Sequence, residues 1–509
     1  MAASKRWLLV LIAAMVVVGG SWFGIPGARA QSAVPFPADL PWYNVRRPLT
    51  LRDLRGRAVL LDFFTPGCIN CIHMLPAEKT LEERFGKRLV VIGIDSPKFS
   101  DSKTRKGLES FIQRYGLRHP IVLDPEMRLW QAYGVQAWPT LVLLGPDGRI
   151  RQTFIGEQSL EQLAGPVEAA LAGAPPASEL KKLPLRPMAF QSGRFTTPGG
   201  IAVSPTLVAI ADTGHNRIVL ADRDGKLRAV IGTGCEGNAD GDYAHAEFNR
   251  PQGLAFHDGA LYVADTDNQS IRRIDLASHA VTTIAGNGKR AYLNTGESAA
   301  LEATLNSPWD LAWSGGKLYV SMAGDHQIWR YDPDGRTIGP WAGTGAEGLQ
   351  DGSRGEAQFA QPSGLSAHGE TLYDVDPESS SVRAISLPGG DVKTLVGRGL
   401  FDFGMKNGDA GQALLQHAEG IAWNAGNLYI ADTFNNALRE LDLTAGKVTT
   451  VAALLDRPLA VATLAPDTLL VAEGDGNRID AVHLPDGKVT PWRVEGLEAP
   501  GTKTCRTQP

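Results

Sequence analysis

The feature that most constrains this chain is a short phrase that recurs through its second half. An apolar strand, the phrase Ala-Asp-Thr and an Ile or Leu six residues after the aspartate occur together three times, and three weaker copies keep the apolar positions. The equivalent positions are Asp212, Asp265, Met322, Asp376, Asp432 and Glu473. A four-stranded propeller blade needs about 40–45 residues, and one blade alone cannot bury both faces of its sheet. The repeat therefore predicts a closed ring of six blades over residues 185–497.

The first four of the sequence intervals between successive equivalent positions are longer than a blade requires, and each contains a similar extra loop. These loops begin near a Gly-x-Gly phrase, at Gly232, Gly286, Gly343 and Gly397. Insertions at one point of every repeat lie on one face of the disc. Because the aspartate recurs with the blade, we expect it to cap a turn between strands and not to act as a catalytic acid.

The residues before the repeats alternate between strand and helix patterns. Apolar or β-branched runs at 59–64, 89–94 and 140–144 read as strands, and 74–85 and 108–115 have helical spacing. This alternation predicts an α/β layered domain over residues 35–172. Residues 173–184 combine proline, small and charged residues, which predicts a linker, and residues 498–509 are expected to form a tail.

The first 30 residues predict export. Lys5 and Arg6 precede an apolar run, and Ala28-Arg29-Ala30 has the small-x-small form of a cleavage site. The alternative is an uncleaved membrane anchor, because residues 7–27 carry no charge. Either interpretation predicts a periplasmic or other extracytoplasmic location. The 50 basic and 55 acidic residues give no electrostatic reason to expect a nucleic-acid partner.

Cys68 and Cys71 carry the chemistry that the sequence predicts. They stand as Cys-x-x-Cys after the strand at 59–64, with Cys68 where a helix is expected to begin. Free N–H groups and a partial positive charge at a helix start favour a thiolate. Cys68 would attack a disulfide, and Cys71, one turn on, would resolve the mixed disulfide.

The same spacing also occurs in zinc sites and in structural disulfides. Zinc needs four ligands, and the sequence offers only His73 nearby and no second Cys-x-x-Cys. The position at a helix start argues against a structural disulfide. We therefore expect neither a metal nor another cofactor.

The phrase at residues 62–71, Asp-Phe-Phe-Thr-Pro-Gly-Cys-Ile-Asn-Cys, resembles a thioredoxin active site, and the later repeats resemble NHL repeats. From about Leu40 onward the chain resembles a family of NHL-repeat proteins with an N-terminal thioredoxin-like (redoxin) domain. This resemblance implies an α/β thioredoxin-like domain followed by a six-bladed NHL-type β-propeller.

The thioredoxin resemblance assigns roles to further residues. Asp62 matches the buried acid that helps take the proton from Cys71. Pro76 matches a helix-kinking proline. Trp138 and Pro139 match the cis-proline loop that faces the disulfide.

The chain also departs from thioredoxin. Ile69-Asn70 replaces Gly-Pro between the cysteines, which leaves the reductant or oxidant direction open. The stretch before Pro139 is longer and includes residues 96–115, an insert common in exported relatives that handle specific partners. Thr65-x-x-Cys68 also matches peroxiredoxins, although Leu61 stands where their proline is expected.

The remaining cysteines, Cys235 in the first blade loop and Cys505 in the tail, are far apart in sequence. A closed ring brings the last blade beside the first, and an oxidising compartment favours pairing. We therefore hypothesise a disulfide between them.

The preferred function is an exported thiol–disulfide oxidoreductase that acts on protein thiols or disulfides, with the propeller binding a protein partner or serving as a scaffold. The main alternative is a binding or scaffold protein whose thioredoxin-like domain is idle, and a less favoured one is a peroxiredoxin-like peroxidase. A lactonase-like metal hydrolase would need acids that converge at the ring axis, and the sequence does not locate such a set.

Overall fold

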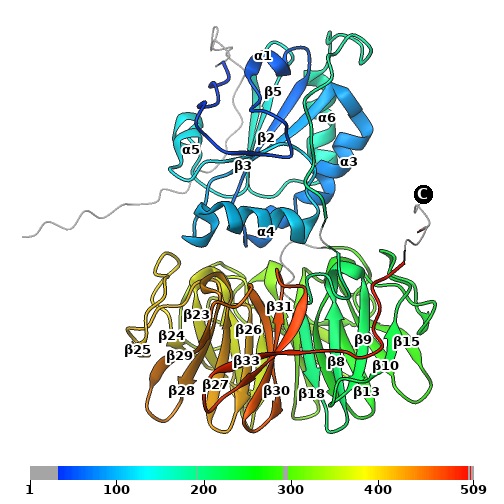
Figure 1. Ribbon diagram of the computed structural model, residues 1–509, viewed down its shortest axis with the longest axis vertical. Coiled ribbons are helices and arrows are strands. Elements are labelled where there is room, and N and C mark those ends of the chain that lie inside the picture. Colours follow the sequence, from blue (N-terminus) through cyan, green and yellow to red (C-terminus); the bar gives the residue numbers. More distant parts are fainter. Residues whose placement is uncertain (1–31, 191, 291–295, 502–504, 506–509) are drawn as a thin grey trace, which may run out of the picture.

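The computed structural model describes residues 32–190, 192–290, 296–501 and 505, so the predicted export signal lies outside the described residues. Within these ranges, no helix combines the length and apolar character needed to cross a membrane. The chain forms two stacked units, with an α/β domain (blue and cyan) above one face of a six-bladed propeller (green to red) (Figure 1).

The α/β domain is built on a six-stranded sheet in the order β1-β4-β3-β2-β5-β6. The strands are β1 (Trp42–Tyr43), β2 (Ala58–Phe64), β3 (Leu89–Asp95), β4 (Ile121–Leu123), β5 (Thr140–Leu144) and β6 (Ile150–Ile155). The helices are α1 (Leu51–Leu54), α2 (Ile69–Ile72), α3 (Leu75–Phe85), α4 (Arg105–Tyr115), α5 (Arg128–Tyr133) and α6 (Leu160–Ala170).

Every residue of β2 is buried, because apolar clusters cover both faces of the sheet. This explains why its sequence is apolar at every position except Asp62 and does not alternate.

Six antiparallel sheets form the propeller, one from each predicted repeat. Their strands are, blade by blade, β7 (Gly200–Val203), β8 (Leu207–Asp212), β9 (Arg217–Asp222) and β10 (Leu227–Ile231); β12 (Pro251–His257), β13 (Ala260–Asp265), β14 (Ser270–Asp275) and β15 (Ala280–Ala285); β17 (Pro308–Ser314), β18 (Lys317–Met322), β19 (Gln327–Asp332) and β20 (Thr337–Ala342); β21 (Leu365–His368), β22 (Thr371–Asp376), β23 (Ser381–Ser386) and β24 (Val392–Val396); β26 (Gly420–Asn424), β27 (Asn427–Asp432), β28 (Ala437–Asp442) and β29 (Lys447–Ala453); β30 (Pro458–Ala465), β31 (Thr468–Glu473), β32 (Arg478–His483) and β33 (Lys488–Trp492). Three blades add a short fifth strand, namely β11 (Gly241–Asp242), β16 (Ser298–Ala299) and β25 (Gly408–Asp409).

The repeated aspartates have a structural role, but the prediction that they cap the turn after them was wrong, because their side chains make no hydrogen bond that caps it. Asp265 Oδ1 accepts the backbone N–H of Asn249 at 2.8 Å, and its Oδ2 accepts Arg272 Nη1 at 2.7 Å. In the third blade the sulfur of Met322 accepts the equivalent N–H, from Asn306, at 3.3 Å. The aspartates thus hold the loop that precedes their blade, and their buried arginine partners were not anticipated from the sequence.

Among the described residues, ring closure uses no strand exchanged between the two ends. Blade one contains only β7–β10 and blade six only β30–β33. Apolar side chains such as Val208 and Leu470 join these blades in one cluster, and Glu495 exchanges backbone hydrogen bonds with Gly225 and Leu227. A disulfide links Cys235, which follows β10, to Cys505 in the final segment, across 270 residues of sequence.

The connecting segment predicted as a linker is packed and not free. Leu180 is buried, Leu183 packs on an apolar cluster of the α/β domain, and the backbone N–H of Arg46 donates to Pro184 O at 2.8 Å. Its apolar residues explain this difference, because they give a proline-rich segment a reason to lie against the α/β domain.

Candidate active site

Cys68 occupies the N-cap position of α2, directly after the turn that follows β2. The backbone N–H of Cys71 donates to Cys68 Sγ at 3.4 Å, and both cysteines are present as free thiols. A helix N-terminus and an N–H donor both stabilise negative charge on sulfur. The local sequence therefore places Cys68 as the attacking sulfur.

Cys71 lies deeper than Cys68 and is almost completely buried. Burial, followed by the neighbouring Cys68, raises the pKa of the Cys71 thiol well above its usual range. Cys71 thus holds its proton until a nearby base removes it, which is the behaviour required of a resolving cysteine.

Two carboxyl groups are buried next to each other near Cys71. Burial raises the pKa of Asp62, on β2, to about 7. Glu78, on α3, is fully buried, and burial together with the charge of Asp62 raises its pKa well above the usual range. Neither oxygen of Glu78, nor Oδ1 of Asp62, meets a hydrogen-bond donor among the described residues.

Adjacent carboxyl groups without a donor are most stable when they share one proton. The pair is therefore a site that can accept or release a proton near Cys71. Asp62 was predicted from the sequence, whereas Glu78 was missed. The sequence did offer a signal for Glu78. It stands three residues before the apolar Leu81, which places both on the same, core-facing side of the helix.

The two predicted prolines stand directly before β5 and in the first turn of α3. The Trp138–Pro139 peptide is cis, and Trp138 packs against the cluster that contains both cysteines. Pro76 is in the first turn of α3, after the break that separates α2 from α3.

The propeller binds the active-site turn directly. Gln361 donates from Nε2 to Gly67 O at 2.9 Å and accepts the Ile69 N–H through Oε1 at 2.8 Å. The Ile69 side chain packs on Trp309 of blade three. Gly67 has φ +96°, and a Cβ there would lie 2.4 Å from His417 Nε2. Cys68 is consequently only 9% exposed.

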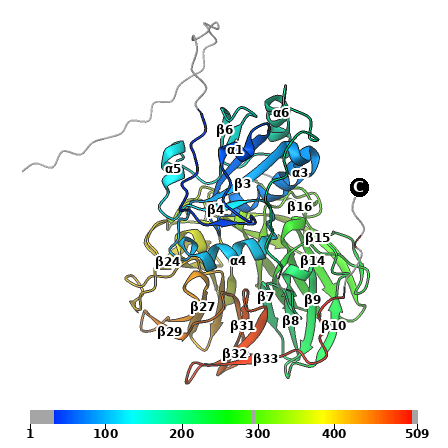
Figure 2. The same cartoon turned by 45° about the horizontal axis from the view of Figure 1, so that its top comes forward.

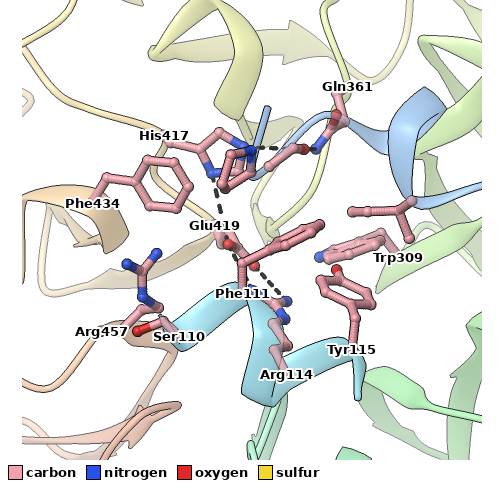
Figure 3. Close-up of a pocket in the computed structure, with 13 residues that line it drawn as sticks. Ser110, Phe111, Arg114, Tyr115, Trp309, Gln361, His417, Glu419, Phe434 and Arg457 are labelled. Atoms are coloured by element: carbon pink, nitrogen blue, oxygen red, sulfur yellow. Dashed lines mark hydrogen bonds and ion pairs between the residues drawn. The ribbon is translucent and has the colours of Figure 1, made fainter. Parts of the chain in front are cut away.

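Buried ion pairs fix this docking. Arg114 of α4 reaches Glu419 of the propeller with two hydrogen bonds of 3.0 and 2.9 Å (Figure 3). Lys98 Nζ donates to Glu378 Oε2 at 2.5 Å. Figures 1 and 2 both show α4, part of the predicted insert, between the sheet and the propeller. The insert therefore forms much of the contact with the propeller.

The interface is tight on one side of Cys68 and open on the other. Around His417, Phe111 and Trp309 only about 20 Å³ of space remains (Figure 3). Cys68 itself lines a pocket of about 220 Å³ between the domains. The residues that line it are Thr65, Cys68, Ile69, Asn70, Lys98, Gln136, Ala137, Trp138, His326, Glu347, Gln361, Glu378, Leu400 and Phe401.

His73, the residue weighed as a zinc ligand, instead bridges the domains. Its Nδ1 lies 2.7 Å from Glu157 Oε1 and its Nε2 lies 2.7 Å from Ser307 Oγ. In the part of the chain that the structure describes, no three His, Cys, Asp or Glu side chains are grouped to hold a metal.

Comparisons with known proteins match both domains. Residues 56–150 match the thioredoxin-like family model and residues 248–274 match the NHL-repeat model. NHL repeat-containing protein 2 of Bos taurus is 37% identical over 476 residues, which cover 84% of this chain and 65% of that protein. Protein SUPPRESSOR OF QUENCHING 1, chloroplastic, of Arabidopsis thaliana is 34% identical over 518 residues, which cover 93% and 49%.

A bacterial protein matches the first domain alone. Thiol-disulfide oxidoreductase ResA of Bacillus anthracis is 31% identical over 120 residues, which cover 23% of this chain and 66% of that protein. The chain thus spans about half to two thirds of the length of these three relatives.

Proposed function

Since the chain belongs to the NHL-repeat proteins with an N-terminal thioredoxin-like domain, we propose that it is an exported thiol–disulfide oxidoreductase whose propeller controls access to Cys68. The observation that carries this proposal is the asymmetry of the pair. Cys68 lies at a helix start beside a pocket, and Cys71 is buried near a proton acceptor.

The proposed reaction follows from these positions. The Cys68 thiolate attacks a disulfide, a Cys68–substrate disulfide forms, and the first thiolate leaves. The Cys71 proton passes to the Asp62–Glu78 pair, and the Cys71 thiolate then attacks Cys68 Sγ. The second substrate thiolate leaves, and two electrons have moved from the cysteine pair to the substrate. The reverse sequence oxidises a dithiol.

The test is a redox titration of the full chain in glutathione buffers, with free thiols alkylated and identified by mass spectrometry. We expect a reversible Cys68–Cys71 disulfide with a single midpoint, lost in Cys71→Ser. If no such disulfide forms at any potential, the proposed function is wrong.

The burial of Cys68 favours a second candidate, a scaffold protein whose thioredoxin-like domain is idle. This alternative predicts that Cys68 reacts with no disulfide, large or small. Cys68→Ser and the wild type would then behave identically in single-turnover assays.

Export and a protein partner on the propeller belong to the same proposal. The Cys235–Cys505 disulfide supports an oxidising compartment. One propeller face is covered by the first domain, so a protein partner would bind the opposite face or the rim. N-terminal sequencing of the protein from fractionated cells should find a new terminus after Ala30, and a retained signal in the membrane fraction would instead indicate an anchor.

A further inference from the structure

We infer that Cys68 acts on small, amine-bearing disulfides that enter the pocket between the two domains. This inference rests on the proposed function and names its substrate class. It adds a binding site to which both domains contribute.

Access to Cys68 limits the size of the substrate. Gln361 binds the backbone of both neighbours of Cys68, Gly67 and Ile69, and Cys68 is only 9% exposed. A disulfide on the surface of a folded protein therefore cannot reach the Cys68 sulfur. The pocket that Cys68 lines holds about 220 Å³. Pockets for drug-sized ligands are commonly about 300–1,000 Å³, so this one suits a smaller molecule.

The mouth of the pocket has an unbalanced negative charge. Lys98 and Glu378 neutralise each other, and both side chains are buried. Glu347 is exposed beside them, and its carboxylate has no hydrogen bond or ion pair with any described residue. Partial desolvation in the pocket, followed by the charge of Glu378, raises the pKa of Glu347 to about 7. The unpaired Glu347 therefore sets the charge preference, most strongly above neutral pH.

The other groups in the pocket do not oppose a cation. His326 Nδ1 accepts the Gln361 N–H at 3.0 Å, and burial lowers the pKa of His326 to about 4, so the ring is neutral. Phe401 is 70% exposed and Trp138 is half-buried, and both rings line the pocket. Lys98 Nζ lies 5.2 Å from the centroid of the Phe401 ring, so this ring already faces one ammonium group. A carboxylate beside an exposed aromatic ring is a suitable environment for a second one.

The step balances with the reduced chain as the electron donor. Cys68 attacks RS–SR, which forms Cys68–S–S–R and releases RS⁻. Cys71 then closes the Cys68–Cys71 disulfide and releases the second RS⁻. Each thiolate takes one proton, so one disulfide yields two RSH.

The test is a single-turnover assay of the reduced full chain with three disulfides of similar size, at a mildly alkaline pH that ionises Glu347. Cystamine carries two positive charges, 2-hydroxyethyl disulfide is neutral and 3,3′-dithiodipropionate carries two negative charges. Each rate is divided by the rate at which free dithiothreitol reduces the same disulfide, which corrects for the different intrinsic reactivities of the three disulfides. We expect cystamine to react about tenfold faster than dithiodipropionate, and insulin to react slowest.

In Glu347→Gln the corrected rate with cystamine should fall to the rate with the neutral disulfide. In Glu347→Lys dithiodipropionate should react faster than cystamine. Glu370→Gln, an exposed carboxylate outside the pocket, is the matched control and should change nothing.

The outcomes distinguish failure of the proposed substrate class from failure of the proposed oxidoreductase function. If insulin reacts as fast as cystamine, or if neither Glu347 variant alters the order, the pocket inference is overturned while the oxidoreductase proposal stands. If Cys68 reacts with no disulfide, both fail.

Discussion

Buried carboxylates occur in both domains, and their surroundings differ. In the propeller, Asp265 and Asp432 each face a buried arginine, Arg272 and Arg439. Near the active site, Asp62 and Glu78 face each other without an arginine between them. The arginine opposes the effect of burial, so the pKa values of Asp265 and Asp432 rise only to about 6, whereas two adjacent carboxyl groups compete for a proton. The same residue type is thus structural in one domain and suited to proton transfer in the other.

The largest effect is expected from breaking a propeller pair. Arg272→Ala would remove the buried ion-pair partner of Asp265, which costs about 3–5 kcal/mol in the free energy of unfolding. Urea denaturation followed by circular dichroism measures the change. A loss below about 1 kcal/mol would show that this pair does not hold the blade together.

Removing the acid near Cys71 should act on rate. Asp62→Asn removes the carboxyl group whose charge acts on the Cys71 thiol and leaves only Glu78 of the pair, so resolution of the Cys68 mixed disulfide should slow about 100-fold at neutral pH. Rapid-quench measurement of the second thiol released reports this step. The initial attack by Cys68 serves as the internal control and should keep its rate.

The two regions can also be compared through pH. In the folded state the pKa of Asp62 is raised from 3.8 to about 7, so between these values the folded chain holds a proton that the unfolded chain has lost. The Asp62 contribution to stability is therefore present at low pH and falls as pH rises, by roughly 2 kcal/mol between pH 5 and pH 7. Asp62→Asn, which stays neutral, should remove that part of the slope. The measurement is urea denaturation of the wild type and Asp62→Asn at each pH. If the free energy of unfolding has the same dependence on pH in both proteins, the prediction is wrong.

The smallest effect is expected from breaking one of the ion pairs that cross the domain boundary. Arg114→Gln removes the partner of Glu419 and should loosen the docking, so that iodoacetamide alkylates Cys68 about fivefold faster. Arg84→Gln breaks an exposed pair with Glu168 and is the control. An exposed pair contributes about 0–1 kcal/mol, so its alkylation rate should match the wild type.

Local patterns predicted most of the fold. The six blades followed from a phrase whose apolar positions survive even where Met322 replaces aspartate, because strand packing needs those positions in every blade. The place of Cys68 at a helix start followed from the strand before it.

The docking of the two domains could not be predicted in this way. Gln361 meets Ile69 across 292 residues of sequence, and Arg114 meets Glu419 across 305. Such contacts depend on how two complete domains orient, which no local pattern encodes. The insert at 96–115 was recognised as extra chain, but nothing in its own sequence shows that it packs on a propeller.

The closure of the ring has a consequence for biosynthesis. Blade one packs against blade six and against Glu495, both made from the last part of the chain. The apolar side chains of blade one that pack on blade six therefore stay exposed while the ribosome makes the other five blades. A chaperone-binding phase during synthesis is expected at these side chains, and it should end only when the final segment arrives.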